Sequence, residues 1–157
     1  MANNNTIRIR KNTEDSRIYD TISDFGVYVI EEPMLEPTEV KDMGSTDWLD
    51  EHGIDVYNAP KSYFKDFDVE LTLGIKELKK EDETIVTCHE QYKRFVEYLT
   101  TNGILHDMYC PWVQVGRTDV RYKSTSNIEF ERVDGMSYMI FKAKFHVADP
   151  KTEIVEF

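Results

Sequence analysis

The chain has 157 residues, of which 40% are hydrophobic and 31% charged, as in an ordinary globular protein. Its net charge of −11, from 30 acidic residues against 19 Lys and Arg, argues against tight nucleic-acid binding, because neutralising phosphates requires clustered bases. No stretch approaches the roughly 20 apolar residues of a membrane-spanning helix, so we expect no membrane association.

The first segment, residues 1–17, is polar, and we expect it to be a flexible N-terminal arm. Its only pattern is an alternation around Ile7 and Ile9. This pattern predicts that the segment pairs as an edge strand if a partner strand is available to it. The remaining residues, 18–157, are expected to form one domain. A β-branched and aromatic run, 25–32, predicts a strand that ends before Pro33.

The clearest strand is expected over residues 67–75, where apolar side chains alternate with Asp, Glu and Thr. A period of two places one face on a core and the other in water. A helix is expected over residues 84–101, ended by Asn102 and Gly103. Its apolar stripe consists of Cys88, Tyr92, Phe95, Val96 and Leu99.

A hairpin is expected around Asp134 and Gly135, a typical pair for a type I′ turn. That turn sets Phe130 opposite Met139 on a buried face. The same face is expected to hold Ile128 opposite Phe141, then Ala143, Phe145 and Val147. Together the elements predict a β-rich α+β fold: two antiparallel sheets, as a sandwich or open barrel, with one helix packed on a sheet.

The segment "DWLDEHGIDVY", residues 47–57, lies within a stretch that lacks periodicity. Asp47, Asp50, Glu51 and Asp55 offer oxygen ligands, but their spacing is not the alternating pattern of an EF-hand. A solvated acidic loop with a turn at Gly53 is therefore favoured over a calcium site. The four histidines are scattered without the spacing of a zinc site, so we expect no bound metal.

No motif for catalysis stands out in the chain. Cys88 belongs to the apolar stripe of the helix and Cys110 ends a predicted strand, so both are interpreted as core thiols. The sequence contains no glycine-flanked serine, phosphate-cradling loop or dinucleotide fingerprint. We therefore expect a protein that is not an enzyme and needs no cofactor. Tyr109, Trp112 and Tyr122 are interpreted as a packed sheet edge, with a sugar-stacking platform as the alternative.

One ordered set of segments resembles a known family. It comprises "YDTISDFGVYV", the linker "EEPMLEP", "DWLDEHGIDVY", the strand "YFKDFDVELTLGI", the helix end "FVEYLTTNGI" and "FKAKFHVADP". This set, spanning residues 19–150, resembles bacteriophage tail proteins with the tail-tube-like fold, especially the N-terminal domain of distal tail proteins. Asp47, Trp48, Asp50, Glu51 and Gly53 match that family's D-W-x-D-E-x-G loop.

The resemblance implies a structural role in a phage or prophage tail. Such domains form rings, typically hexameric, through which DNA passes without specific binding, and they contact other tail proteins. The expected location is the virion tail, after synthesis in the bacterial cytoplasm. These 157 residues lack the second, carbohydrate-binding-like domain that distal tail proteins often carry. Distal adaptor, tube subunit and completion component therefore all stay open as its place in the tail.

The interface hypothesis concerns the loop that carries Trp48. The resemblance predicts that Asp47, Trp48, Asp50, Glu51, Asp55 and Tyr57 form a subunit-interface loop. In the alternative, Trp48 fills an end of its own sandwich. Three other functions stay open: a carbohydrate- or metal-binding module, a hydrolase that uses Cys110, and a tube-like component of a bacterial injection system.

Overall fold

The computed structural model describes residues 6–13, 16–31, 35–42, 44–50, 52–58 and 60–154. The elements follow the chain in this order: β1 (Arg8–Lys11), β2 (Tyr19–Asp20), α1 (Thr21–Phe25), β3 (Val27–Val29), β4 (Ser45–Thr46), β5 (Asp55–Val56), β6 (Phe67–Lys76), β7 (Leu78–Lys79), β8 (Ile85–Val86), α2 (Cys88–Thr100), β9 (His106–Cys110), β10 (Val115–Val133), β11 (Met136–Val147) and β12 (Glu153–Ile154).

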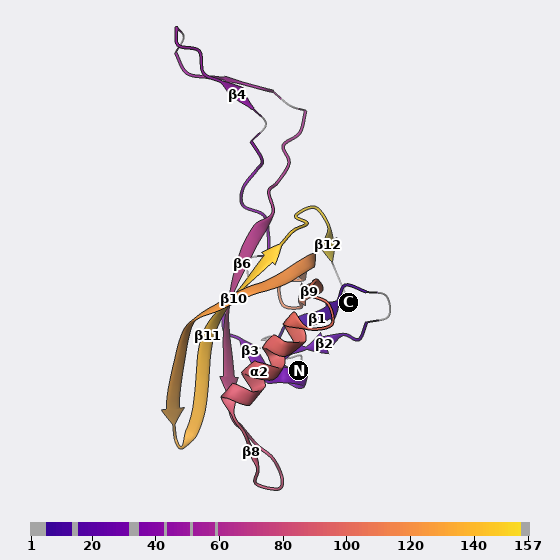
Figure 1. Cartoon of the computed structure of the whole chain (residues 1–157), viewed down its shortest axis with the longest axis vertical. Helices are drawn as coiled ribbons and strands as arrows, with labels where there is room; N and C mark the ends of the chain where they lie inside the picture. The colour runs from indigo at the N-terminus through magenta and orange to yellow at the C-terminus, as the bar shows by residue number, and fades with distance from the viewer. Residues whose placement is uncertain are drawn as a thin grey trace.

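One antiparallel sheet of eight strands forms the body, in the order β2-β1-β9-β10-β11-β6-β3, with β12 paired to β10. It curls into a half-barrel (Figure 1), and register shifts along β10 mark bulges of the kind that bend long strands. β4 with β5 and β7 with β8 form two small ribbons. The predicted β-rich α+β class is confirmed, but the body strands lie in one curled sheet instead of two facing layers.

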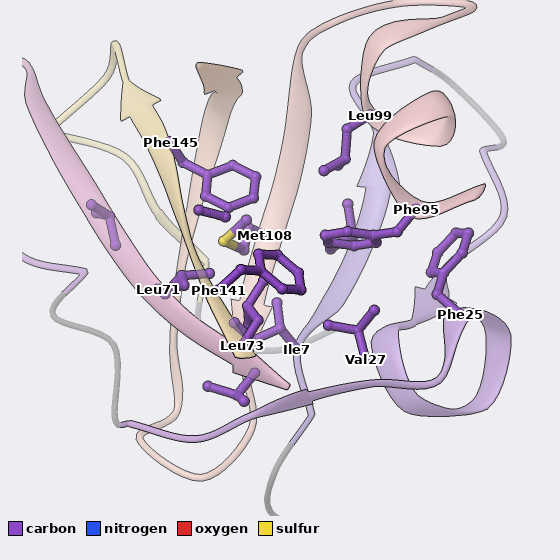
Figure 2. Close-up of a cluster of buried hydrophobic side chains, with 14 of the residues drawn as sticks. Ile7, Phe25, Val27, Leu71, Leu73, Phe95, Leu99, Met108, Phe141 and Phe145 are labelled. Carbon is purple, nitrogen blue, oxygen red and sulfur yellow. The ribbon is translucent and has the colours of Figure 1, made fainter. Parts of the chain in front are cut away.

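The core lies between this sheet and α2 (Figure 2). β6 alternates as predicted, with Val69, Leu71, Leu73 and Ile75 buried. Phe95 and Leu99 on α2 reach the same core, each 1% exposed. Truncating a buried aromatic side chain to alanine in such a core costs about 3–5 kcal/mol.

The predicted helix is confirmed, although it begins later than expected. Thr87 caps it by accepting a bond of 3.2 Å from the backbone N–H of Glu90, and the two residues before the cap pair as β8. The predicted stop is observed, because Asn102 and Gly103 have positive φ angles of 54° and 106°. The structure adds a short helix, α1, that the pattern did not predict.

The N-terminal segment differs from the flexible arm expected over residues 1–17. β1 lies inside the sheet, paired on one side with β2 and on the other with β9. Ile7 and Ile9 are each 1% exposed, so their alternation buries two large side chains in the core. Residues 1–5 and 14–15 lie outside the described residues.

The β10–β11 hairpin turns at Asp134 and Gly135, whose φ angles of 52° and 76° suit the predicted type I′ turn. Phe130 faces Met139 as predicted, but a register shift between Ser126 and Glu129 breaks the expected pairing of Ile128 with Phe141. The β11 side is buried as expected. On β10, however, Ile128 and Phe130 are 47% and 66% exposed, because the hairpin extends beyond the body (Figure 1).

Candidate functional site

The most prominent surface feature is a long loop, residues 36–66, which we call the projecting loop (Figure 1). Apart from residues 43, 51 and 59, it is described throughout. Its two sides run antiparallel: Val40 bridges to Phe64 near the body, and Ser45 pairs with Val56 further out. Between its two ends, the described strand and bridge pairings of the loop join one side to the other, and the exposed side chains along it lie outside the core.

The outer part of this loop, residues 44–58, is called the loop tip. Gly44 and Gly53 have φ angles of 98° and 78°, a left-handed conformation that glycine adopts without strain. The apolar side chains of the tip are open to solvent, with Leu49 fully exposed. The large exposed apolar residues here are Trp48, Leu49, Ile54, Val56 and Tyr57. Large exposed apolar clusters are typical of interaction sites on protein surfaces.

Trp48 is held in place within the tip itself. Its indole Nε1–H donates to Asp55 Oδ2 at 2.8 Å, which ties the two sides of the tip together. The residue remains 52% exposed. β4, which ends two residues before it, lies far from the body sheet (Figure 1). Trp48 therefore does not fill an end of the body, and its ring is available to another molecule.

The six residues predicted for the interface map onto this tip. Five of them are exposed there: Asp47, Trp48, Asp50, Asp55 and Tyr57. The sixth, Glu51, lies outside the described residues. Their part in a subunit contact stays a prediction.

Arg117, on β10, ties the start of the projecting loop to the body. Its side chain is 3% exposed and donates from Nε to the carbonyl of Leu35 at 2.8 Å and from Nη2 to Glu36 Oε2 at 2.8 Å. Nη1 donates to the carbonyls of Pro150 and Thr152, at 3.0 and 3.2 Å. One guanidinium thus joins the loop to the chain segment that leads into β12.

The other end of the loop is tied by His146 on β11. Its ring nitrogens lie 3.0 Å from Asp66 Oδ2 and 2.8 Å from Asp68 Oδ1. The hydrogen bond from His146, with a further contribution from Lys123, holds the pKa of Asp68 below its usual value. Both ends of the loop are therefore held to the sheet by polar side-chain contacts.

The two thiols lie in the core, as predicted. Cys88 and Cys110 are 4% and 0% exposed, and neither forms a disulfide. Cys88 Sγ lies 3.5 Å from the carbonyl of Ile75 and 3.4 Å from that of Ser137, and burial raises its pKa. The contacts with two carbonyl oxygens and the burial of Cys88 both disfavour its thiolate, which is the nucleophilic form.

Burial also keeps the side chain of His106 away from solvent and lowers its pKa. His106 is 1% exposed, and desolvation together with the nearby charge of Lys11 lowers its pKa to about 4. Within the described ranges, no group of three or more His, Cys, Asp or Glu side chains is arranged to hold a metal ion. No helix described here is long and apolar enough to cross a membrane.

The aromatic residues considered for sugar stacking pack against the core. Tyr109 is 6% exposed, and Trp112 and Tyr122 are partly buried beside the core cluster. Tyr122 meets the ring of Phe145 edge to face, with centroids 5.8 Å apart. The three rings therefore support the packed-edge interpretation.

No protein-family model and no curated protein matches this chain.

A second open surface lies along the outer half of β10. β9 and β12 pair with this strand only between Val115 and Val120. In the described part of the chain, residues 121–133 have β11 as their strand neighbour and no strand on the other side. An unpaired strand edge presents free backbone donors and acceptors to a partner.

Sequence reasoning did not identify all the exposed apolar residues of the tip. Leu49, Ile54 and Val56 lie between prolines without a helical or strand period. The signal available was that a long aperiodic segment carried large apolar side chains, because a solvated linker has little need of them. The roles of Arg117 and His146 left no local signal, since their partners are distant in the chain.

Proposed function

We propose that this protein is a structural subunit of a bacteriophage or prophage tail that assembles with copies of itself into a ring around the DNA channel. The projecting loop is its subunit contact, and no catalytic step is involved. The observation that carries the proposal is the loop tip, where Trp48 and Leu49 are exposed at the end of an anchored extension. The resemblance of residues 47–57 to the tail-protein loop supports it.

Two further features support this role. A net charge of −11 repels a polyanion, as a channel wall through which DNA slides requires. The half-barrel leaves the outer edge of β10 open to a neighbouring strand. We therefore expect weak DNA binding at physiological salt, together with self-association.

The test compares oligomeric mass for the wild-type chain and a double variant, Trp48→Ala with Leu49→Ala, by light scattering at rising concentration. A buried aromatic anchor contributes about 2 kcal/mol or more to an interface, so the variant is expected to need at least tenfold more protein to assemble. The control is Leu78→Ala with Ile85→Ala, which removes two exposed apolar side chains from the β7–β8 ribbon. Equal assembly by the tip variant and the wild type would refute the role of the loop.

A further inference from the structure

The open edge of β10, residues 121–133, carries charges that are separated by sign. In the hairpin, β11 lies between β6 and β10, which leaves β10 on the outside (Figure 1). Arg121 and Lys123 stand at the start of this edge and Glu129 and Glu131 near its end, and all four side chains are exposed. Arg132, the remaining charge, donates to a carbonyl of its own hairpin turn at 3.4 Å.

An antiparallel second copy, related by a two-fold axis at Ser126, brings these opposite charges together. In that register Arg121 of each copy faces Glu131 of the other. Lys123 faces Glu129 in the same way. Opposite charges that face each other across two strands stabilise the pairing, and the symmetry repeats each pair. Edges that are protected against pairing often carry Lys, which repels a second copy, so the separation of signs here favours self-pairing.

The irregularities of β10 preserve this register. Compared with β11, β10 has an extra residue between Tyr122 and Ser124 and another between Ser126 and Glu129. One bulge lies on each side of Ser126, so the start and the end of the edge keep equal lengths when they lie along each other. Lys123, within the first bulge, stays opposite Glu129, because a bulge sets two neighbouring residues against one.

The charges of the edge are available to a second copy. Among the described residues, no ion pair involves Arg121, Glu129 or Glu131. Lys123 Nζ lies 3.2 Å from Asp68 Oδ2, with the two side chains 38% and 39% exposed. A surface pair of this kind contributes little, so the ammonium can also meet a carboxylate of a second copy.

A hollow beside the start of the edge matches an exposed ring near its end. The hollow has a volume of about 350 Å³ and is lined by Leu99, Thr100, Ile104, Arg121, Tyr122 and Lys123. In the register about Ser126, Phe130 of one copy faces Tyr122 of the other. Both rings lie on the core side of the sheet, because they pair with Phe145 and Met139, which are buried. Phe130 is 66% exposed in the single chain, and facing aromatic rings stabilise a strand pair.

We propose that the β10 edges of two copies pair antiparallel about a two-fold axis at Ser126. Backbone hydrogen bonds then join the sheet of one copy to the sheet of the other. The same surface serves both copies, so the contact is complete with two of them. It goes beyond the proposed ring contact, because it does not use the loop tip. The edge is short, so the pair is weak alone and adds to contacts made elsewhere.

The first test captures the pair with a disulfide at the axis. Facing Cα atoms in an antiparallel pair lie about 4.5–5.5 Å apart, within the range that a disulfide spans, so Ser126→Cys should cross-link two copies on mild oxidation. The control is Ser124→Cys, which is equally exposed but about four residues, or about 13 Å, from its own counterpart. The native thiols, Cys88 and Cys110, are buried. We expect covalent dimer to form about tenfold faster for Ser126→Cys in non-reducing electrophoresis. Equal rates would overturn the proposal.

The second test reverses charges in the Ser126→Cys chain. Glu131→Arg places Arg opposite Arg121, and Arg121→Glu places Glu opposite Glu131, twice in each pair of copies. We expect each variant to cross-link about tenfold more slowly, because facing like charges destabilise a strand pair. An equal mixture of the two variants restores opposite charges at both ends, so it should regain the original rate. A mixture that stays slow would overturn the register.

The third test separates this contact from the proposed ring contact. Trp48→Ala with Leu49→Ala in the Ser126→Cys chain should leave the cross-linking rate unchanged. A rate that falls about tenfold would assign the contact to the loop tip and overturn the edge pairing. If the wild type assembles in light scattering but Ser126→Cys does not exceed its control, only the edge pairing fails. If Ser126→Cys cross-links faster than its control while the wild type stays monomeric, only the ring fails.

Discussion

Replacing Arg117 with methionine tests the anchoring of the projecting loop. The guanidinium is 3% exposed and donates to the carbonyls of Leu35, Pro150 and Thr152 and to the carboxylate of Glu36. Methionine keeps much of the side-chain volume, so little cavity forms and the lost hydrogen bonds dominate the change. The variant therefore isolates the polar contribution of the anchor.

The expected loss in the free energy of unfolding follows from the hydrogen-bond acceptors that Arg117 leaves without a donor. The bond to Leu35 is buried, and the other three are partly buried, so water replaces some of the lost contacts. A buried acceptor without a donor costs about 1–3 kcal/mol. We expect Arg117→Met to lower the free energy of unfolding by about 3 kcal/mol. Glu36→Gln should cost under about 1 kcal/mol, because the carboxylate is 45% exposed.

Urea denaturation followed by circular dichroism measures both changes. Hydrogen exchange adds a local readout, since the amide of Ile154 in β12 is expected to lose protection when Pro150 and Thr152 are released. A loss below about 1 kcal/mol for Arg117→Met, with unchanged exchange in β12, would show that the loop is anchored by other contacts.

Three further predictions concern the body. Burial holds the pKa of His106 at about 4 against 6.5, so the unfolded chain takes up the proton first. Stability should fall on acidification, by about 2 kcal/mol from pH 7 to pH 5, and His106→Gln should remove that slope in denaturation curves. Gly116→Ala should lower the melting temperature, because its Cβ would lie 2.8 Å from the backbone oxygen of Met108. Lys11→Met should cost about 1 kcal/mol in urea denaturation, since Lys11 Nζ donates to the carbonyls of Thr101 and Gly103 after α2.

Local patterns predicted the elements whose determinants are close together in the chain. The period of two along β6 and the apolar stripe of α2 each lie within one segment, and both elements form. The turn at Asp134 and Gly135 also depends on neighbouring residues alone, and it forms with the predicted φ signs. The Ile128 pairing failed because a bulge at Asn127, φ 52°, is not marked by glycine or proline.

Such local patterns could not predict which strands and side chains pair when they are far apart in the sequence. β1 is short, and its partner β9 lies nearly 100 residues away, so only the burial of Ile7 and Ile9 in the folded chain reveals it as an inner strand. In the sequence, nothing distinguishes Arg117 from the other bases of β10, because its partners come together only in the folded chain. The apolar hollow beside Gly74 likewise forms only where that residue pairs with Tyr28 and Ile140 on the two neighbouring strands.

The most direct test of the account is sedimentation equilibrium of the full chain over rising concentration, beside the double variant of Trp48 and Leu49. The account predicts that the wild-type mass rises from the 18.5 kDa monomer toward that of a closed ring, hexameric by the resemblance, while the variant remains monomeric. A wild-type mass that stays at 18.5 kDa up to near-millimolar protein, or a variant that assembles equally well, would contradict it.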